Sequence, residues 1–216
     1  EIPGRRDEFI VLSAHYDSTS LSHGAYDNMS GCAGLLGIME QLKGKELNYG
    51  LRFVFCGSEE RGLLGSKAYV KEHKEELDKI VQNINLDMIG TYMGKFISCV
   101  SAEDKLAHYI SYMAAEIGFP IEAKTGVYSS DSTPFADSGI PALSFARIAS
   151  SNVAPIHCRY DVKAVMSMEQ LQWDIDFLVK FTERFANAAV CPVAREIPEK
   201  IKKELDEYLA RKRKEQ

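Results

Sequence analysis

Residues 51–66 read LRFVFCGSEERGLLGS and place two adjacent glutamates, Glu59 and Glu60, just after an apolar run. The β-branched and aromatic content of that run predicts a buried strand. Ligand and metal sites gather at the carboxyl ends of strands in α/β sheets. Because neighbouring side chains on an extended segment point in different directions, one carboxylate could bind a metal while the other faces a reacting water. Taken alone, the same residues are more typical of a solvated acidic turn before a helix.

The composition is that of one soluble globular domain, with or without a tail. The chain has 216 residues, of which 45% are hydrophobic and 26% are charged. A formal net charge of −5 provides no basic surface for nucleic acid, and no apolar run approaches the roughly 20 residues that a membrane span requires. The five cysteines form no CxxC pair, which favours reduced thiols and a cytoplasmic over a secreted protein.

Strand and helix patterns alternate along the chain on both sides of the opening stretch. Apolar runs predict strands at 9–14, 51–55, 96–100 and 141–146, and residues 81–90 are interpreted as a further strand with polar residues at its end. Helical patterns lie at 32–42, 63–73, 107–117 and 171–189. Ser30 is expected to be the N-cap of the first of these helices. The alternation predicts an α/β fold, namely a three-layer sandwich with a mostly parallel, mixed central sheet.

The last part of the chain differs in composition from the rest. We expect residues 1–191 to form a single domain and residues 192–216 to form a highly charged helical tail. A few apolar residues of the tail could dock on the domain or on a partner, and these are Ile201, Leu205, Tyr208 and Leu209.

Residues that can bind a metal follow several of the predicted strands. They are His15, Asp27, Glu60 with its neighbour Glu59, Asp87 and His157. About one βα unit or more separates each from the next, so all of them can converge at one edge of the sheet. Two imidazoles and three carboxylates suit zinc better than calcium or magnesium, which prefer oxygen alone. Five ligands are too many for one tetrahedral zinc with an open position, and they fit two zinc ions if one carboxylate bridges.

Each of these residues has a simpler explanation when it is considered singly. A histidine after a strand is more often hydrogen-bonded in the core than bound to a metal, and Asp27 is more often a turn residue. Five such coincidences at strand ends are nevertheless less expected than one shared site. Asp17 lies two residues after His15, on the same side of the strand, and can accept a hydrogen bond from that imidazole.

An ordered set of motifs resembles the zinc aminopeptidases of metallopeptidase family 28, which include the bacterial leucyl aminopeptidases. The motifs are HYD at 15–17, DNMSG at 27–31, SEERGLLGS at 58–66, NLDMIG at 85–90, SSDSTPF at 129–135, GIPALSF at 139–145 and HCRYD at 157–161. The resemblance runs from about residue 8 to residue 190 and implies a phosphorylase/peptidase-like sandwich. Family domains usually have further strands before the first motif, so this chain is expected to be a fragment, a processed chain or a minimal version.

The resemblance also implies a role for each candidate residue. The positions of His15 and Asp87 bind one zinc in the family, and those of Glu60 and His157 bind the other. Asp27 matches the residue that bridges the two ions, Glu59 the general base, and Asp17 a residue that orients the histidine ligand. The implied reaction is hydrolysis of the N-terminal peptide bond of peptides with a free N-terminus, by a di-zinc-bound water. An oligomer is compatible with the sequence but is not indicated by it.

Three further residues are candidates for orienting ligands or for contacting substrate, and these are Asp161, Tyr128 and Asp131. Tyr128 is a candidate oxyanion donor because Ile156 stands where some relatives have a tyrosine before the last histidine. Ser132 replaces a histidine of the family's loop. Two alternatives are a glutaminyl-cyclase-like transferase with a single zinc and a non-catalytic peptidase-like binding module. The complete ligand set with Glu59 disfavours the second.

Overall fold

The computed structural model describes the backbone of residues 1–215 and the side chains of residues 1–210. Its sheet has six strands in the order β2-β1-β3-β6-β4-β5. β4 is antiparallel to β6, and the other neighbouring strands are parallel to each other. The strands are β1 (Phe9–His15), β2 (Gly50–Cys56), β3 (Ile80–Leu86), β4 (Lys95–Ser101), β5 (Glu122–Thr125) and β6 (Ala142–Ile148).

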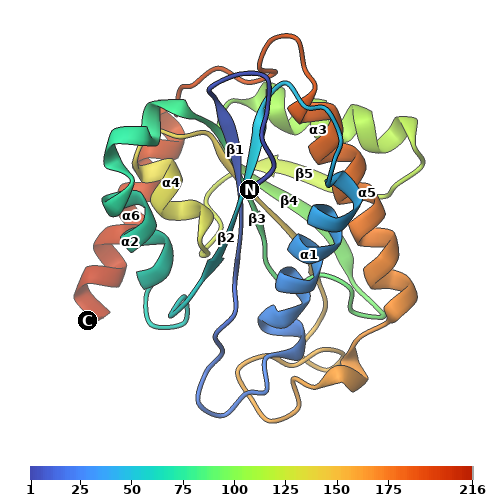
Figure 1. Ribbon diagram of the computed structural model, residues 1–216. Helices are drawn as coiled ribbons and strands as arrows, with labels where there is room; N and C mark the ends of the chain where they lie inside the picture. Colours follow the sequence, from blue (N-terminus) through green and yellow to red (C-terminus); the bar gives the residue numbers. More distant parts are fainter. Residues whose placement is uncertain (216) are drawn as a thin grey trace.

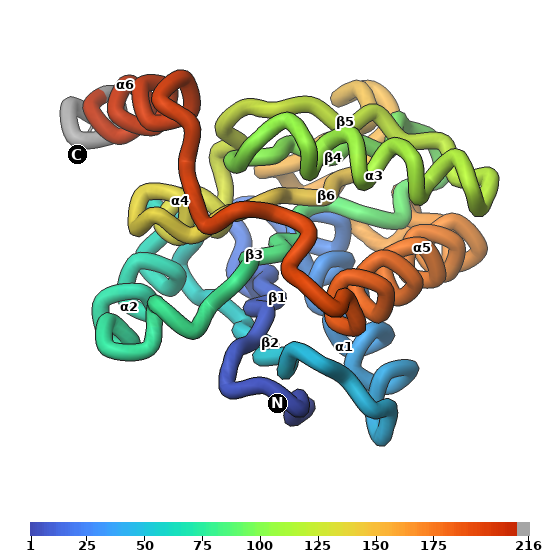
Figure 2. The backbone as a smooth tube through the Cα atoms, turned by 90° about the horizontal axis from the view of Figure 1, so that it is seen from above, coloured from blue at the N-terminus to red at the C-terminus, as the bar shows by residue number. Residues whose placement is uncertain are grey.

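Helices cover both faces of this sheet. They are α1 (Ser30–Leu42), α2 (Leu64–Glu72), α3 (Asp104–Glu116), α4 (Ser132–Asp137), α5 (Met168–Ala186) and α6 (Glu199–Glu215). Figure 1 shows α1, α3 and α5 on one side of the sheet and α2, α4 and α6 on the other, and the view from above in Figure 2 agrees. The predicted three-layer α/β sandwich with a mostly parallel, mixed sheet is therefore confirmed. None of the helices in residues 1–215 is long and apolar enough to cross a membrane.

Two apolar clusters hold these layers together. The larger cluster packs α1, α3 and α5 on the sheet, and rings from three elements touch within it, namely Phe96, Phe145, Phe177 and Phe181. The smaller cluster lies on the other face and joins Val11 of β1 and Phe135 of α4 to Ile201 and Leu205 of α6. Full burial of such side chains stabilises a fold by about 1.5–3 kcal/mol each. The apolar residues at the start of the charged tail therefore dock on the body of the protein.

Two local features differ from the sequence expectations. β5 was not predicted, because its sequence EAKT lacks an apolar run and it pairs with β4 alone at the sheet edge. Ser30 is the first residue of α1 rather than its N-cap. Its hydroxyl donates to the carbonyl of Tyr26 (2.6 Å) and accepts from the amide of Ile89 (3.0 Å). Ser30 thus ties α1 to the loop after β3 instead of capping the helix.

Three neighbouring parallel strands end at the same edge of the sheet. His15 is the last residue of β1, which lies between β2 and β3. Glu59 and Glu60 follow the end of β2, and Asp87 follows β3 directly. The fold therefore brings four of the predicted metal-binding residues to one place, as the topology of parallel sheets favours.

Candidate metal centre

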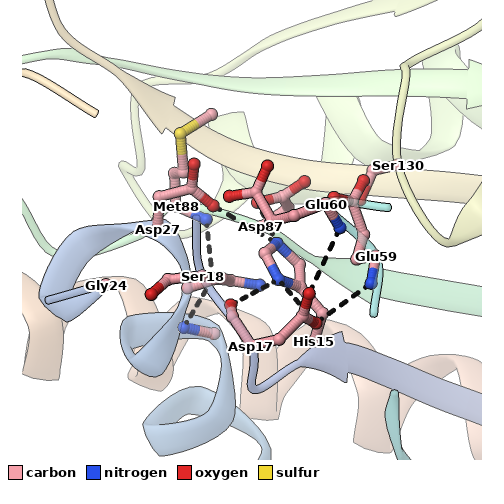
Figure 3. A network of polar contacts seen from close by, with 12 residues as sticks. His15, Asp17, Ser18, Gly24, Asp27, Glu59, Glu60, Asp87, Met88 and Ser130 are labelled. Carbon is pink, nitrogen blue, oxygen red and sulfur yellow. Dashed lines mark hydrogen bonds and ion pairs between the residues drawn. The ribbon is translucent and has the colours of Figure 1, made fainter. Parts of the chain in front are cut away.

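The buried imidazole of His15 lies between carboxylates on two sides (Figure 3). Its Nε2 is 3.2 Å from Oδ1 of Asp27 and 3.5 Å from Oδ1 of Asp87. Its Nδ1 is 3.1 Å from the backbone carbonyl oxygen of Asp17. A hydrogen bond from Nδ1 to that carbonyl leaves Nε2 facing the two carboxylates, where it either carries a proton or offers its lone pair to a metal ion.

A turn before α1 positions Asp27 at the site. The turn η1 (Ala25–Met29) has non-helical dihedral angles at Asp27 and Asn28, and the peptide bond between them is cis. The Asn28 amide donates to the carbonyl of Leu86 (2.9 Å), and its oxygen accepts from the backbone of Met88 (3.0 Å). A Cβ at Gly31 would lie 2.4 Å from the Leu86 carbonyl oxygen, so glycine allows α1 to approach β3 this closely.

The second histidine meets the other oxygen of the same aspartate. Nε2 of His157 is 3.1 Å from Oδ2 of Asp27 and 3.1 Å from Oε2 of Glu60. The His157 side chain is 51% exposed, whereas those of Asp27 and Glu60 are largely buried. Asp27 therefore directs one carboxylate oxygen toward each histidine, which is the arrangement that a bridging carboxylate requires.

Asp17 holds the backbone that carries the two adjacent glutamates. Its Oδ1 accepts from the amide of Glu59 (3.0 Å) and its Oδ2 from the amide of Glu60 (3.3 Å). The Asp17 carboxylate is 3.6 Å from Nδ1 of His15, so the hydrogen-bonding contact with the imidazole comes from the backbone carbonyl instead. Gly62, at φ 100°, then turns the chain back toward α2.

Left-handed backbone at non-glycine residues is concentrated around this site. Four such residues occur in the described chain, and they are Ser58 (φ 57°), Leu63 (φ 61°), Met88 (φ 67°) and His157 (φ 57°). Each adjoins or belongs to a loop that carries one of the candidate ligands. Such conformations cost free energy and tend to persist where the surrounding structure holds a functional arrangement in place.

The side chains form two groups that fit divalent metal ions. Ligand atoms of His15, Glu59 and Asp87 lie within 4.8 Å of one another, and so do those of Asp27, Glu60 and His157. Oε1 of Glu60 and Oδ1 of Asp87 are buried without a hydrogen-bond partner. Buried polar atoms are normally satisfied, so these oxygens are suited to a ligand. The mixture of imidazole and carboxylate donors favours a transition metal over magnesium or calcium.

The same cluster shifts the acid–base behaviour of its members. Burial opposes protonation of His15, but its contacts with Asp27 and Asp87 outweigh burial and raise the pKa of His15 to about 12. Burial raises the pKa of Glu59 to about 9, with the positive charge of His15 opposing and the carboxylate of Asp87 adding to the rise. Burial and the charge of Asp27 also raise the pKa of Glu60. So many carboxylates in one buried site call for a compensating cation.

Asp161 supports Asp27 rather than His157. Its carboxylate is fully buried and accepts from the backbone amides of Tyr26 (2.7 Å) and Asp27 (3.1 Å). The Ser22 hydroxyl donates to the same group (3.4 Å). Asp161 therefore fixes the turn that presents the proposed bridging carboxylate, although it is four residues from His157 in sequence.

Tyr128 and Asp131 occupy different positions relative to the centre. Tyr128 lines the cavity over the metal-binding groups, and burial together with the nearby charge of Asp87 raises the pKa of its hydroxyl. Asp131 is fully buried behind the cavity and accepts from the Ser66 hydroxyl of α2 (2.5 Å). Burial raises the pKa of Asp131 to about 6. Asp131 thus anchors α2 beside the site and does not line the cavity.

The cavity above the two groups measures about 190 Å³. Its wall contains the six clustered side chains and also Gly62, Leu63, Met88, Tyr128, Ser129, Ile156 and Tyr208. Tyr208 belongs to α6, and the sequence did not indicate that the charged tail reaches this cavity. The amphipathic spacing of Ile201, Leu205 and Tyr208 was the available signal, but it does not say what lies opposite that face.

A sequence model described as Peptidase family M28 matches residues 1–177, which include all of these groups except Tyr208. The chain belongs to peptidase family M28. The resemblance found in the motifs is thereby confirmed.

Curated relatives of this M28 chain include proteins named as aminopeptidases. The aminopeptidase YwaD of Bacillus subtilis is 37% identical over 147 residues, which is 65% of this chain and 32% of YwaD. Leupeptin-inactivating enzyme 1 of Streptomyces exfoliatus is 34% identical over 143 residues, or 64% of this chain and 32% of that protein. The aligned part of the chain therefore covers about one third of these relatives.

Solved structures of a zinc aminopeptidase and of an M28 peptidase precursor share the fold. A zinc aminopeptidase from Bacillus subtilis superposes with a TM-score of 0.76 and 28% identity, over 93% of this chain and 52% of that one. An M28 peptidase precursor from Shewanella amazonensis superposes with a TM-score of 0.75 over 92% of this chain and 46% of that one, at 23% identity. The chain thus spans about half the length of these structures.

Proposed function

We propose that this chain is a metal-dependent aminopeptidase that holds two zinc ions and hydrolyses the N-terminal peptide bond of peptides. The observation that carries the proposal is the position of Asp27, whose two carboxylate oxygens face His15 and His157 separately. A single four-coordinate ion would not require ligands on both sides of one carboxylate. Asp87 completes the first group and Glu60 completes the second. The zinc aminopeptidase from Bacillus subtilis supports the choice of metal.

Glu59 is the proposed proton acceptor of the reaction. Zinc, when bound, supplies Lewis acidity that polarises a peptide carbonyl and acidifies water. Glu59 lies half-buried in the same cavity, beside the ligand position of Glu60, with its backbone fixed by Asp17. Cations bound beside Glu59 would favour its ionised form over the protonated one. The carboxylate then takes a proton from the attacking water and returns it to the departing amine. Tyr128, which lines the cavity, is the proposed donor of a hydrogen bond to the substrate carbonyl oxygen.

Zinc content and N-terminal dependence test this proposal together. Elemental analysis of the zinc-saturated protein, after removal of free metal, is expected to return two ions per chain. The protein should release p-nitroaniline from leucine p-nitroanilide and should fail to act on the N-acetylated form of the same compound. The acetylated compound is the matched control because it differs only in the free amino group.

Three results would contradict the proposal. One ion per chain would favour a single-zinc transferase, as in glutaminyl cyclases, over the di-zinc peptidase. Turnover of the acetylated compound at a similar rate would remove the dependence on a free N-terminus. Full zinc loading without turnover of any aminoacyl anilide or peptide would leave a metal-binding module rather than an enzyme.

A further inference from the structure

The C-terminal helix α6 reaches the candidate centre from outside the segment that matches the family. The family match ends at residue 177, whereas α6 spans Glu199–Glu215. α6 lies beside α4 on one face of the sheet, as Figures 1 and 2 both show. Ile201 and Leu205 anchor it there, with exposed fractions of 1% and 2%. Tyr208 is on the same helical face, because residues three or four positions apart share one side of a helix.

Tyr208 is held at both ends of its side chain. The anchored helix fixes its backbone, and its hydroxyl lies 2.8 Å from Oγ of Ser129 in a hydrogen bond. Ser129 follows Tyr128, and all three of these residues line the cavity over the metal-binding groups. The Tyr208 ring is therefore a fixed part of the cavity wall.

We propose that Tyr208 is a specificity-determining residue, whose ring forms part of the wall against which the substrate's N-terminal side chain packs. This inference rests on the proposed aminopeptidase function. The reacting amino and carbonyl groups must lie against the imidazole and carboxylate side of the cavity. The substrate side chain then faces the remaining wall, where Tyr128 and Tyr208 are the largest residues and Leu63, Met88 and Ile156 are apolar.

The size of the cavity supports a single-residue subsite. Its volume of about 190 Å³ is smaller than the roughly 300–1,000 Å³ of pockets for drug-sized ligands. A wall that closes so small a space decides which side chains enter it. Discrimination between apolar side chains by such contacts is modest, typically about 10–200-fold for a difference of one methylene. Loss of the Tyr208 ring should therefore change the preference among substrates more than it changes the rate of the chemical step.

The experiment compares Tyr208→Ala with Tyr208→Phe and with Lys203→Ala, an exposed position on the same helix. Each zinc-loaded variant is assayed with the p-nitroanilides of leucine and tryptophan. Tyr208→Ala is expected to raise the tryptophan-to-leucine ratio of kcat/KM about tenfold, mainly through a higher KM for the leucine compound. Tyr208→Phe keeps the ring and should stay within about twofold of the wild type. Lys203→Ala should leave the ratio unchanged.

A binding measurement separates this inference from the proposed function. Titration calorimetry with free L-leucine, which is not hydrolysed, is expected to give about tenfold weaker binding to Tyr208→Ala than to the wild type or Lys203→Ala. Zinc content and thermal midpoint are measured for every variant, and Tyr208→Leu replaces Tyr208→Ala if the latter does not fold.

Two patterns of results would overturn the inference. Unchanged ratios and unchanged leucine binding in Tyr208→Ala, with an active wild type, would remove Tyr208 from the subsite and leave the proposed function intact. If the wild type hydrolyses none of the compounds, the proposed function fails. Leucine binding then decides alone: weaker binding by Tyr208→Ala supports Tyr208 in the cavity wall, and equal or undetectable binding rejects it.

Discussion

Glu59 and Glu60 are neighbours in sequence with the same chemistry, and their surroundings separate them. The Asp17 carboxylate fixes both backbone amides, and Glu60 is 3.1 Å from Nε2 of His157. Glu59 instead lies in the group with His15 and Asp87. Two tasks are therefore open to Glu59, namely binding a metal and accepting a proton, and substitution distinguishes them.

Glu59→Gln is expected to keep both zinc ions and to lower turnover about 10²–10⁴-fold, because the amide keeps the shape of the carboxylate but cannot accept a proton. The measurement is turnover of leucine p-nitroanilide together with zinc content. Glu72→Gln, at an exposed position at the end of α2, is the matched control and should behave like the wild type. Loss of one zinc ion from Glu59→Gln would identify Glu59 as a ligand, and near-normal turnover would place the base elsewhere.

Asp161→Asn is expected to weaken zinc binding roughly 10–100-fold while the protein still folds. The native carboxylate accepts from the amides of Tyr26 and Asp27 with separate oxygens, whereas asparagine offers only one acceptor. The turn that presents Asp27 should therefore loosen. Zinc affinity by competition with a fluorescent chelator measures the effect, with the exposed Asp137→Asn as control. Equal affinities for the two variants would contradict a positioning role for Asp161.

At the scale of secondary-structure elements, a buried ion pair joins β6 to α5 and to the loop after β3. Asp174 accepts from the guanidinium of Arg147 at 2.6 Å and from the amide of Gly90 at 2.9 Å. Both side chains are buried. Gly90 lies three residues after Asp87, so this contact also holds the loop that carries a candidate ligand.

Asp174→Ala is expected to destabilise the protein by about 3–5 kcal/mol, because it leaves the Arg147 guanidinium buried without its partner. Urea unfolding followed by circular dichroism gives the free energy. The control is Glu116→Ala, which removes an exposed pair with Arg184 and should cost about 0–1 kcal/mol. Similar losses in the free energy of unfolding of the two variants would contradict a larger contribution from the buried Arg147 pair.

The sequence predicted well those elements whose own residue pattern is typical of a strand or a helix. Apolar runs predicted β1 and β2, and helical spacing of apolar residues predicted α3 and α5. β5 escaped prediction because an edge strand with the sequence EAKT is defined by its pairing with β4 rather than by its own residues. The N-cap prediction at Ser30 was wrong because its hydroxyl forms other hydrogen bonds. It donates to the carbonyl of Tyr26 in the preceding turn and accepts from the amide of Ile89 in the loop after β3.

The candidate site likewise contains some residues that the sequence predicted and others whose position depends on distant contacts. Strand-end placement and motif resemblance predicted one shared site for the metal-binding residues His15, Asp27, Glu60, Asp87 and His157. The support of Asp27 by Asp161 depends on a contact across more than a hundred residues. The position of Tyr208 depends on how α6 docks on the smaller apolar cluster, and helical periodicity specifies the buried face but not its neighbour.

For the whole molecule, zinc is expected to raise the thermal midpoint of unfolding. A ligand at about 100 times its Kd that binds only the folded state adds about 2.7 kcal/mol. At about 2–4 °C per kcal/mol for a chain of this size, the midpoint should rise by about 5–11 °C. Differential scanning calorimetry of the metal-free protein, with and without zinc, measures the shift. Magnesium at the same concentration is the control, because it prefers sites made of oxygen alone. An equal rise with magnesium would contradict the preference for a transition metal.

The candidate ligands are spread over most of the chain, from His15 to His157, and the cavity wall extends to Tyr208. During synthesis the chain leaves the ribosome from its N-terminus, at about 5–20 residues per second. The first histidine is therefore exposed long before the second exists, and the wall formed by α6 comes later still. The second metal-binding group is therefore incomplete until residue 157 has emerged, and the cavity wall is incomplete until residue 208 has emerged.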